Sequence, residues 1–143
     1  MAKEILARIK DRFSTRVLKV FEKSTRRIYI DFDLKDIPEV VSFLFRDMGG
    51  RLATATGIDT QKNIEILYHF SFDSSGTIIS LRTLLDRNNP EIESITPIIK
   101  AAEWIEREIH ELLGVNFRNH PNLKRLLLPE DWPEGKCPLR RAE

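Results

Sequence analysis

The stretch Asn63-Ile64-Glu65-Ile66-Leu67-Tyr68-His69-Phe70-Ser71-Phe72 carries the clearest strand pattern in the sequence. Every second residue from Ile64 to Phe72 is apolar, which matches a strand with one buried face. Residues 73–76, Asp-Ser-Ser-Gly, predict a turn, and residues 77–85 run back with a similar alternation. The shorter segment 51–58, rich in Thr and Ala, precedes them. These segments predict three consecutive strands of an antiparallel sheet.

The N-terminal third predicts a helix followed by a hairpin. Apolar side chains recur on one side of residues 3–12, which indicates an amphipathic helix. Residues 15–22 fit the period of a helix and that of a strand equally well. Residues 28–32 alternate as a strand does, and the polar segment 23–26 before them is typical of a hairpin turn. This turn favours a strand for residues 15–22.

Two further helices complete the expected domain. The first begins near Asp36 and ends at Gly49-Gly50, with the predicted buried stripe Val40, Val41, Leu44, Phe45 and Met48. The second spans about 97–113 and ends at Gly114, with the stripe Ile98, Ala102, Ile105, Ile109 and Leu112. The polar segment 86–94 between sheet and helix predicts a surface loop. The fold class is therefore α+β, a mainly antiparallel sheet packed with helices.

The sequence changes character after Gly114. Four prolines exclude a long helix or a central strand from the last 23 residues. We expect a domain over residues 1–114 and an extended proline-rich C-terminal tail over 115–143. The tail must bury its apolar side chains on its own domain or on a partner, and the residues alone leave both open. These side chains are Phe117, Leu123, Leu126, Leu127, Leu128, Trp132 and Leu139.

Composition narrows the class of protein. The 143 residues carry 23 Lys and Arg against 22 Asp and Glu, which suits one domain with its own core. No apolar run approaches the roughly 18 residues that span a bilayer, and we expect no signal peptide. The single cysteine, Cys137, excludes a disulfide framework and a cysteine-ligated cluster, which favours a reducing cytoplasmic location.

The near-neutral total hides an uneven distribution of charge. Residues 1–27 carry nine basic and three acidic side chains, a net of +6. Residues 28–111 carry eight basic and fifteen acidic side chains, a net of −7, and residues 112–143 carry six and four, a net of +2. Such asymmetry marks either a partner surface, nucleic acid included, or a solvated face.

Residue patterns for catalysis or metal binding are weak. His69, His110, His120 and Cys137 lack the close spacing of zinc ligands. On a helix, Glu106 and Glu108 point about 200° apart, so they are no general acid/base pair. We expect Arg107 to pair with Glu103 and Glu111, and Glu106, at the border of the apolar stripe, to have a fixed cationic partner.

The C-terminal half resembles a known family. The motifs are the run from Trp104 to Leu127, with its Glu106-Arg107-Glu108 and His120-Pro121, and the later Leu128-Pro129-Glu130-Asp131-Trp132 and Pro138-Leu139-Arg140-Arg141. Arg51 to Asp59, Tyr68-His69-Phe70 and Ser94-Ile95-Thr96 match upstream. These motifs are similar to those of the 30 kDa subunit of the respiratory-chain NADH dehydrogenase, complex I. The run from Leu128 to Gly135 looks most like the equivalent subunit of membrane-bound group 4 nickel–iron hydrogenases and related archaeal ferredoxin-linked complexes.

The resemblance implies a non-catalytic scaffold subunit in the peripheral arm of an ion-translocating complex. It implies no cofactor on this chain, with iron–sulfur clusters, and in hydrogenases a nickel–iron centre, held by other subunits. The implied partners are the large catalytic and small iron–sulfur subunits, on the cytoplasmic side, touching the membrane only through the complex and binding no nucleic acid. A complex I-type NADH/quinone dehydrogenase is the alternative parent.

Two rival functions stay open. One is a stand-alone interaction or nucleic-acid module that uses the basic segment 1–27, and the other is an enzyme that uses Glu106, Glu108 and His110. On the scaffold interpretation the tail lies over the large subunit, with Trp132, Leu126 and Leu128 as anchors. The full set of expected contact residues is Glu106, Arg107, Glu108, Phe117, His120, Pro121, Leu123, Arg125, Leu126, Leu128, Trp132, Pro138, Leu139, Arg140 and Arg141.

Overall fold

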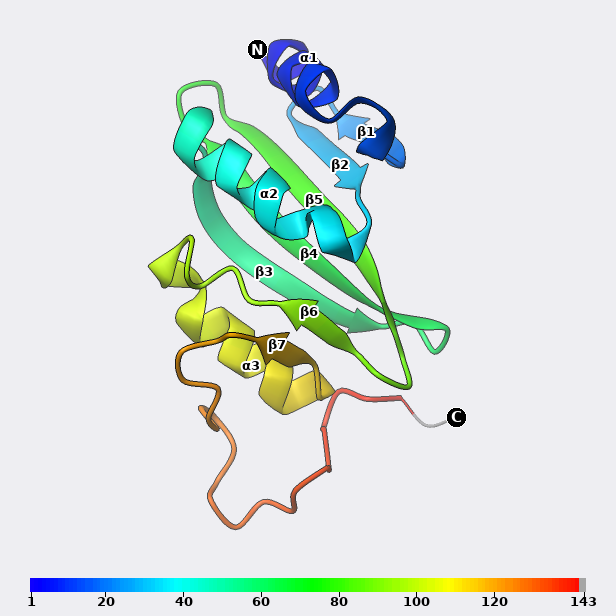
Figure 1. Cartoon of the computed structure of the whole chain (residues 1–143), viewed down its shortest axis with the longest axis vertical. Coiled ribbons are helices and arrows are strands. Elements are labelled where there is room, and N and C mark those ends of the chain that lie inside the picture. The colour runs from blue at the N-terminus through cyan, green and yellow to red at the C-terminus, as the bar shows by residue number, and fades with distance from the viewer. Residues whose placement is uncertain (142–143) are drawn as a thin grey trace.

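A five-stranded sheet forms the body of the molecule, of which the computed structural model describes residues 1–141 (Figure 1). The strand order is β1-β2-β5-β4-β3, and only the β2–β5 pair is parallel. The predicted α+β class with a mostly antiparallel sheet is confirmed. The strands are β1 (Lys19–Ser24), β2 (Arg27–Asp31), β3 (Arg51–Asp59), β4 (Asn63–Phe72) and β5 (Thr77–Asp86).

The predicted central strand lies in the middle of the core. Tyr68 of β4 faces Ala55 of β3 and Leu81 of β5 across the ladder, and its side chain is fully buried. The alternate apolar residues of β4 all point to this face, as the two-residue repeat predicts. The hairpin turns before β2 and between β4 and β5 are also confirmed.

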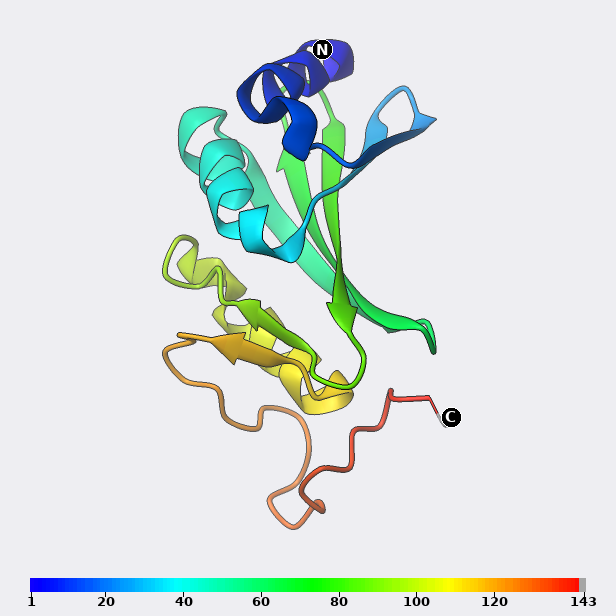
Figure 2. The same ribbon diagram turned by 45° about the vertical axis from the view of Figure 1, so that its right-hand side comes forward.

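Two helical segments cover one face of the sheet (Figure 2). Helix α1 (Ala2–Phe13) buries Phe13, whose ring lies edge-on to Phe32 and Phe43 at centroid distances of 5.6 and 5.5 Å. Helix α2 (Ile37–Ser42) continues as a π-helical turn, Phe43–Asp47. The wider turn shifts the buried stripe, so Phe45, expected in the core, is 38% exposed.

A smaller layer packs below the sheet. Strands β6 (Glu91–Glu93) and β7 (Asn116–Arg118) pair in parallel beside helix α3 (Glu103–Leu113). The expectation of a surface loop over 86–94 was therefore wrong for its second half, because Ile92 pairs with Phe117 and both are buried. Only the folded chain brings this distant partner to the segment.

Helix α3 starts later than the predicted residue 97. Ile95 accepts backbone bonds from Ile98 and Ile99, and Ile99 has extended dihedrals that interrupt the helix. A short 3₁₀ turn, Lys100–Ala102, then leads into α3.

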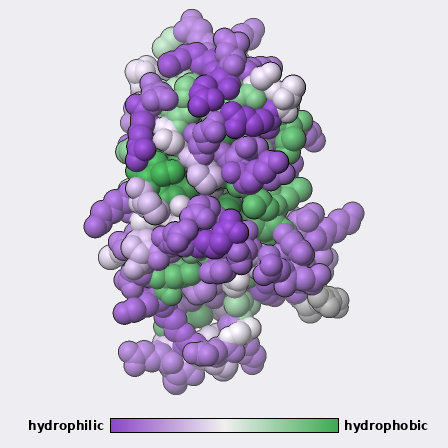
Figure 3. All heavy atoms as spheres, in the orientation of Figure 1, coloured by the Kyte–Doolittle hydropathy of each residue, from purple (hydrophilic) through white to green (hydrophobic). Residues whose placement is uncertain are grey.

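The described part of the C-terminal segment, residues 119–141, has neither helix nor strand and curves beneath α3 (Figure 1). Its tip at the lower end of the molecule is mainly hydrophilic (Figure 3). No helix in the described residues is long and apolar enough to cross a membrane.

Candidate partner interface

Helix α3 carries the side chains that organise the C-terminal segment. The helix ends at Gly114, whose left-handed conformation (φ 75°) suits glycine and turns the chain into β7. The face toward the sheet contains Glu106, Ile109 and Leu113, all buried, whereas the expected stripe residues Ile105 and Leu112 are only half-buried. The burial stripe is therefore rotated by about one residue from the predicted one.

Glu106 is fully buried and is held by neutral donors. Its Oε1 accepts bonds from the hydroxyls of Ser94 and Thr96, each at 2.6 Å. Its Oε2 accepts a bond from the Tyr68 hydroxyl at 3.2 Å and one from the Ile95 amide at 3.1 Å. Burial, followed by the nearby Glu106 carboxylate, raises the pKa of Tyr68 well above its ordinary value.

The expected cationic partner of Glu106 was wrong. Four hydrogen bonds satisfy the carboxylate in its place, and in residues 1–141 no cation lies within ion-pair distance. This carboxylate joins α3 to the segment that leads out of β6 and to the sheet. Glu106, expected at the partner surface, thus lies in the interior.

Glu111 holds the tail through its backbone. Its Oε1 accepts bonds from the amides of Leu126 and Leu128 at 3.1 and 2.8 Å, and its Oε2 accepts one from Leu127 at 2.8 Å. Although burial by itself raises the pKa of Glu111, the three amides bring it below its ordinary value. The carboxylate therefore fixes one turn of the tail against α3.

Two arginines extend this polar scaffold. Arg107 donates to the carbonyls of Lys124 (3.0 Å) and Arg125 (2.6 Å). Arg125 in turn donates to the carbonyls of Pro129 (2.8 Å), Glu130 and Trp132. The expected pairing of Arg107 with Glu103 and Glu111 was therefore wrong, because the returning tail takes up both Arg107 and Glu111.

The end of the described tail is held by a buried ion cluster. Asp59 Oδ1 accepts a bond from Arg87 Nε at 2.9 Å, and Asp59 Oδ2 accepts one from the Arg141 amide at 2.8 Å. The Arg87 hydrogen bond is the largest reason why the pKa of Asp59 lies well below its usual range. Arg140 approaches Asp59 at 3.4 Å and donates to the carbonyls of Leu113 and Arg87.

The turn that starts the tail is fixed by His120. Its Nε2 donates to the carbonyl of Glu103 at 2.9 Å, and its Nδ1 accepts a bond from the Asn122 amide at 3.0 Å. Phe117 is buried in β7, and Leu123 packs against the core. These side chains therefore face their own domain.

Other expected contact residues do reach the surface. Leu139 is 55% exposed, Pro121 and Pro138 are exposed, and Glu108, Leu126, Leu128 and Trp132 are half-buried. Two residues outside the expected set, Trp104 (65%) and Leu127 (62%), are exposed large apolar side chains beside them. Adjacent apolar residues on α3 and on the tail were the available signal, but sequence alone did not show which side faces outward.

Helix α3 does not assemble a catalytic cluster. Glu106 is enclosed by its four donors, while the His110 ring donates from Nδ1 to the Val115 carbonyl at 2.7 Å. Within the described residues, no group of three His, Cys, Asp or Glu side chains could hold a metal ion. The geometry thus gives the rival enzyme hypothesis no support.

Comparisons with known proteins agree with this geometry. Residues 30–143 match the family model described as "Respiratory-chain NADH dehydrogenase, 30 Kd subunit". The corresponding subunit of the F(420)H(2) dehydrogenase of Methanosarcina mazei is 32% identical over 98% of this chain and 90% of its own length. Formate hydrogenlyase subunit 5 of Escherichia coli is also 32% identical over 99% of this chain, which spans only 26% of that longer protein.

Solved structures share the fold. A chain in the structure of the membrane-bound sulfane sulfur reductase, an archaeal respiratory membrane complex, superposes with a TM-score of 0.84 at 21% identity, covering 96% of this chain and 82% of that one. The trypsin-resistant fragment of Nqo5 superposes with a TM-score of 0.70 at 18% identity, covering 85% and 98%. Since the family model covers most of the chain, the protein belongs to the 30 kDa subunit family of the respiratory-chain NADH dehydrogenase, whose members include subunits of hydrogenase-type complexes.

Proposed function

We propose that this chain is a non-catalytic scaffold subunit in the peripheral arm of a membrane-bound oxidoreductase, on the cytoplasmic side. The observation that carries the proposal is the tail, which polar side chains hold by its backbone while Leu127 and Leu139 stay exposed. A segment that is ordered but turns apolar side chains outward is suited to docking, because part of the entropy cost of binding is already met.

The partner is the large catalytic subunit, with the small iron–sulfur subunit beside it. In formate hydrogenlyase subunit 5 and in hydrogenase-4 component G, the region like this chain makes up about a quarter of a longer protein. Such a domain is there joined covalently to a larger one. A domain fused in one protein is expected to meet the same neighbour when it is a separate chain.

A hydrogenase-type, ferredoxin-linked and ion-translocating parent complex fits the sequence motifs best. The clusters, and a nickel–iron centre, belong to the other subunits. The alternative is a complex I-type NADH/quinone dehydrogenase, because other relatives are named as subunits of NADH-quinone oxidoreductases. Nickel together with iron in the purified native complex supports the first parent, and iron with flavin but without nickel supports the second.

The docking proposal is tested by making the tail surface acidic. A tagged full-length Leu127→Asp/Leu139→Asp variant is expected to lose the large subunit on purification from the source cells. The control is Phe45→Ser, an exposed aromatic on the far helical layer. Circular dichroism of the isolated chains confirms that both variants fold. Recovery of the large subunit at the wild-type ratio by the double variant would exclude the tail as the docking surface.

A further inference from the structure

The outer face of the sheet is a second surface without a cover. Helices α1 and α2 lie on the opposite face, and no helix described in residues 1–141 covers this one (Figure 2). Two hollows lie on it, of about 410 and 200 Å³. Arg82 and Asp31 line both hollows, so the two form one groove across the strands.

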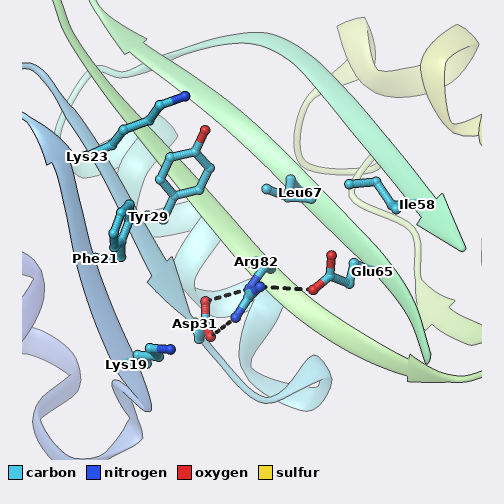
Figure 4. A pocket seen from close by; sticks show the side chains of 9 residues that line it. All are labelled: Lys19, Phe21, Lys23, Tyr29, Asp31, Ile58, Glu65, Leu67 and Arg82. Atoms are coloured by element: carbon cyan, nitrogen blue, oxygen red, sulfur yellow. Dashed lines mark hydrogen bonds and ion pairs between the residues drawn. The ribbon is translucent and has the colours of Figure 1, made fainter. Parts of the chain in front are cut away.

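The floor of the groove is rigid and its charges are balanced. Arg82 donates to both oxygens of Asp31, at 2.9 and 2.6 Å, and to Glu65 at 2.9 Å (Figure 4). These three residues come from the neighbouring strands β2, β5 and β4. Because each carboxylate already binds Arg82, neither neutralises the cations at the rim.

Exposed apolar side chains gather along the groove. Of the nine exposed large apolar residues in the described chain, four line these hollows: Leu18, Phe21, Ile58 and Leu84. The Phe21 ring lies 6.1 Å from that of Tyr29, and Leu67 lies at the base between Tyr29 and Ile58 (Figure 4). Such clustering marks an interaction surface more than scattered exposure does.

The rim of the groove is basic. Lys19 and Lys23 of β1 flank Phe21 on the same face (Figure 4). Among residues 1–141, no carboxylate lies within 4 Å of either ammonium group. The exposed apolar centre with lysines on either side therefore complements a partner that offers an apolar side chain between carboxylates.

We propose that this groove binds an acidic segment of a second protein neighbour, with an apolar side chain against Phe21 and carboxylates on Lys19 and Lys23. The surface lies on β1, β2, β4 and β5, away from the tail and α3. The chain then bridges two neighbours, and the basic charge near its N-terminus gains a role. The groove requires no particular tail conformation, so it can be tested separately from the proposed function.

The first test uses the native complex purified through a tag on this chain. A water-soluble carbodiimide joins amines to carboxylates that are in direct contact. We expect it to couple Lys19 or Lys23 to an Asp or Glu of another subunit, and an amine-acylating reagent to label both lysines more slowly in the complex than in the free chain. Lys3 of α1 is the internal control. Equal labelling of Lys19 and Lys23 in both states overturns the proposal.

The second test needs only the isolated chain. The probe is a fluorescent ten-residue peptide of alternating glutamate and leucine, measured by anisotropy. We expect Lys19→Glu/Lys23→Glu to weaken its binding at least tenfold, and Lys3→Glu/Lys10→Glu, with the same change in net charge, to leave it within twofold. The Leu127→Asp/Leu139→Asp variant keeps full peptide binding even where it loses the large subunit.

Three other outcomes overturn the proposal. Equal peptide affinity in the two lysine variants shows that the charge acts only through the total. Protection of Lys19 and Lys23 by vesicles containing 30% phosphatidylglycerol, but not by the complex in detergent, assigns the groove to lipid. A concentration-dependent dimer in sedimentation that Phe21→Ser abolishes assigns it to a second copy of the chain.

Discussion

The substitution Glu111→Gln tests whether one carboxylate holds the tail. Glu111 is 6% exposed and accepts three backbone bonds, from Leu126, Leu127 and Leu128. Hydrogen bonds to a charged group are worth about 1.5–3 kcal/mol each. The glutamine oxygen retains one or two of them in weaker form, whereas its NH₂ group faces another donor. We therefore expect local opening of the tail to become easier by about 3 kcal/mol.

The assay is hydrogen exchange at the three leucine amides. A change of about 3 kcal/mol corresponds to roughly a hundredfold faster exchange. Amides of β4, which lie in the sheet, should keep their rates because the sheet does not depend on Glu111. The control is Glu108→Gln, a change of the same charge on the same helix at a half-buried position. Unchanged exchange at Leu126–Leu128 in Glu111→Gln would refute the assignment.

The same contact predicts a dependence on pH. The folded-state pKa of Glu111 lies below its ordinary value of 4.5. The stabilisation is therefore complete above that value and is lost as the pH falls through the lower folded-state pKa. Exchange at the three leucine amides, corrected for the intrinsic rate, should accelerate on acidification. In Glu111→Gln this acceleration should be absent, and its persistence would assign it to another group.

Three further substitutions test the packing around α3. Gly57→Ala would place a Cβ 2.5 Å from Leu113 Cδ1, so the free energy of unfolding by urea should fall by about 1–3 kcal/mol, and an unchanged value would mean that α3 shifts freely. Tyr68→Phe removes one of four donors to Glu106, and the same measurement should show a loss of about 1 kcal/mol. Asp59→Asn leaves the buried Arg87 without its charge partner and should cost about 3–5 kcal/mol, whereas Asp73→Asn, at an exposed pair, should change stability by less than about 1 kcal/mol.

Local patterns were sufficient for most of the body. The alternation in 63–72 has one interpretation because a helix would scatter its apolar residues around the axis. The glycines after Met48 and after Leu113 set the two helix ends because few other residues accept a left-handed conformation. The fold class, the strands and the order of elements follow from such short-range features.

Long-range pairing explains what the sequence could not show. Ile92 forms a strand only because Phe117 lies beside it, although the two are far apart in the chain. Glu106 looked like a border residue in need of a cation, yet two hydroxyls from 94–96 and one from β4 enclose it. Arg107 and Glu111 looked like a surface ion pair, but the tail returns to bind both. Each error came from a partner that only the tertiary structure supplies.

The way the tail is held leads to one more prediction about assembly. Since Glu111 binds backbone atoms, Glu111→Gln changes how often the tail is ordered without altering its exposed side chains. The affinity for the large subunit falls only by the fraction of molecules whose tail is open. If exchange shows that the tail of Glu111→Gln is still mostly closed, the affinity should match the wild type. If the tail is mostly open, the affinity should fall in proportion. A large loss of affinity with a closed tail would mean that Glu111 contacts the partner itself, and a full affinity with an open tail would mean that the partner binds another conformation.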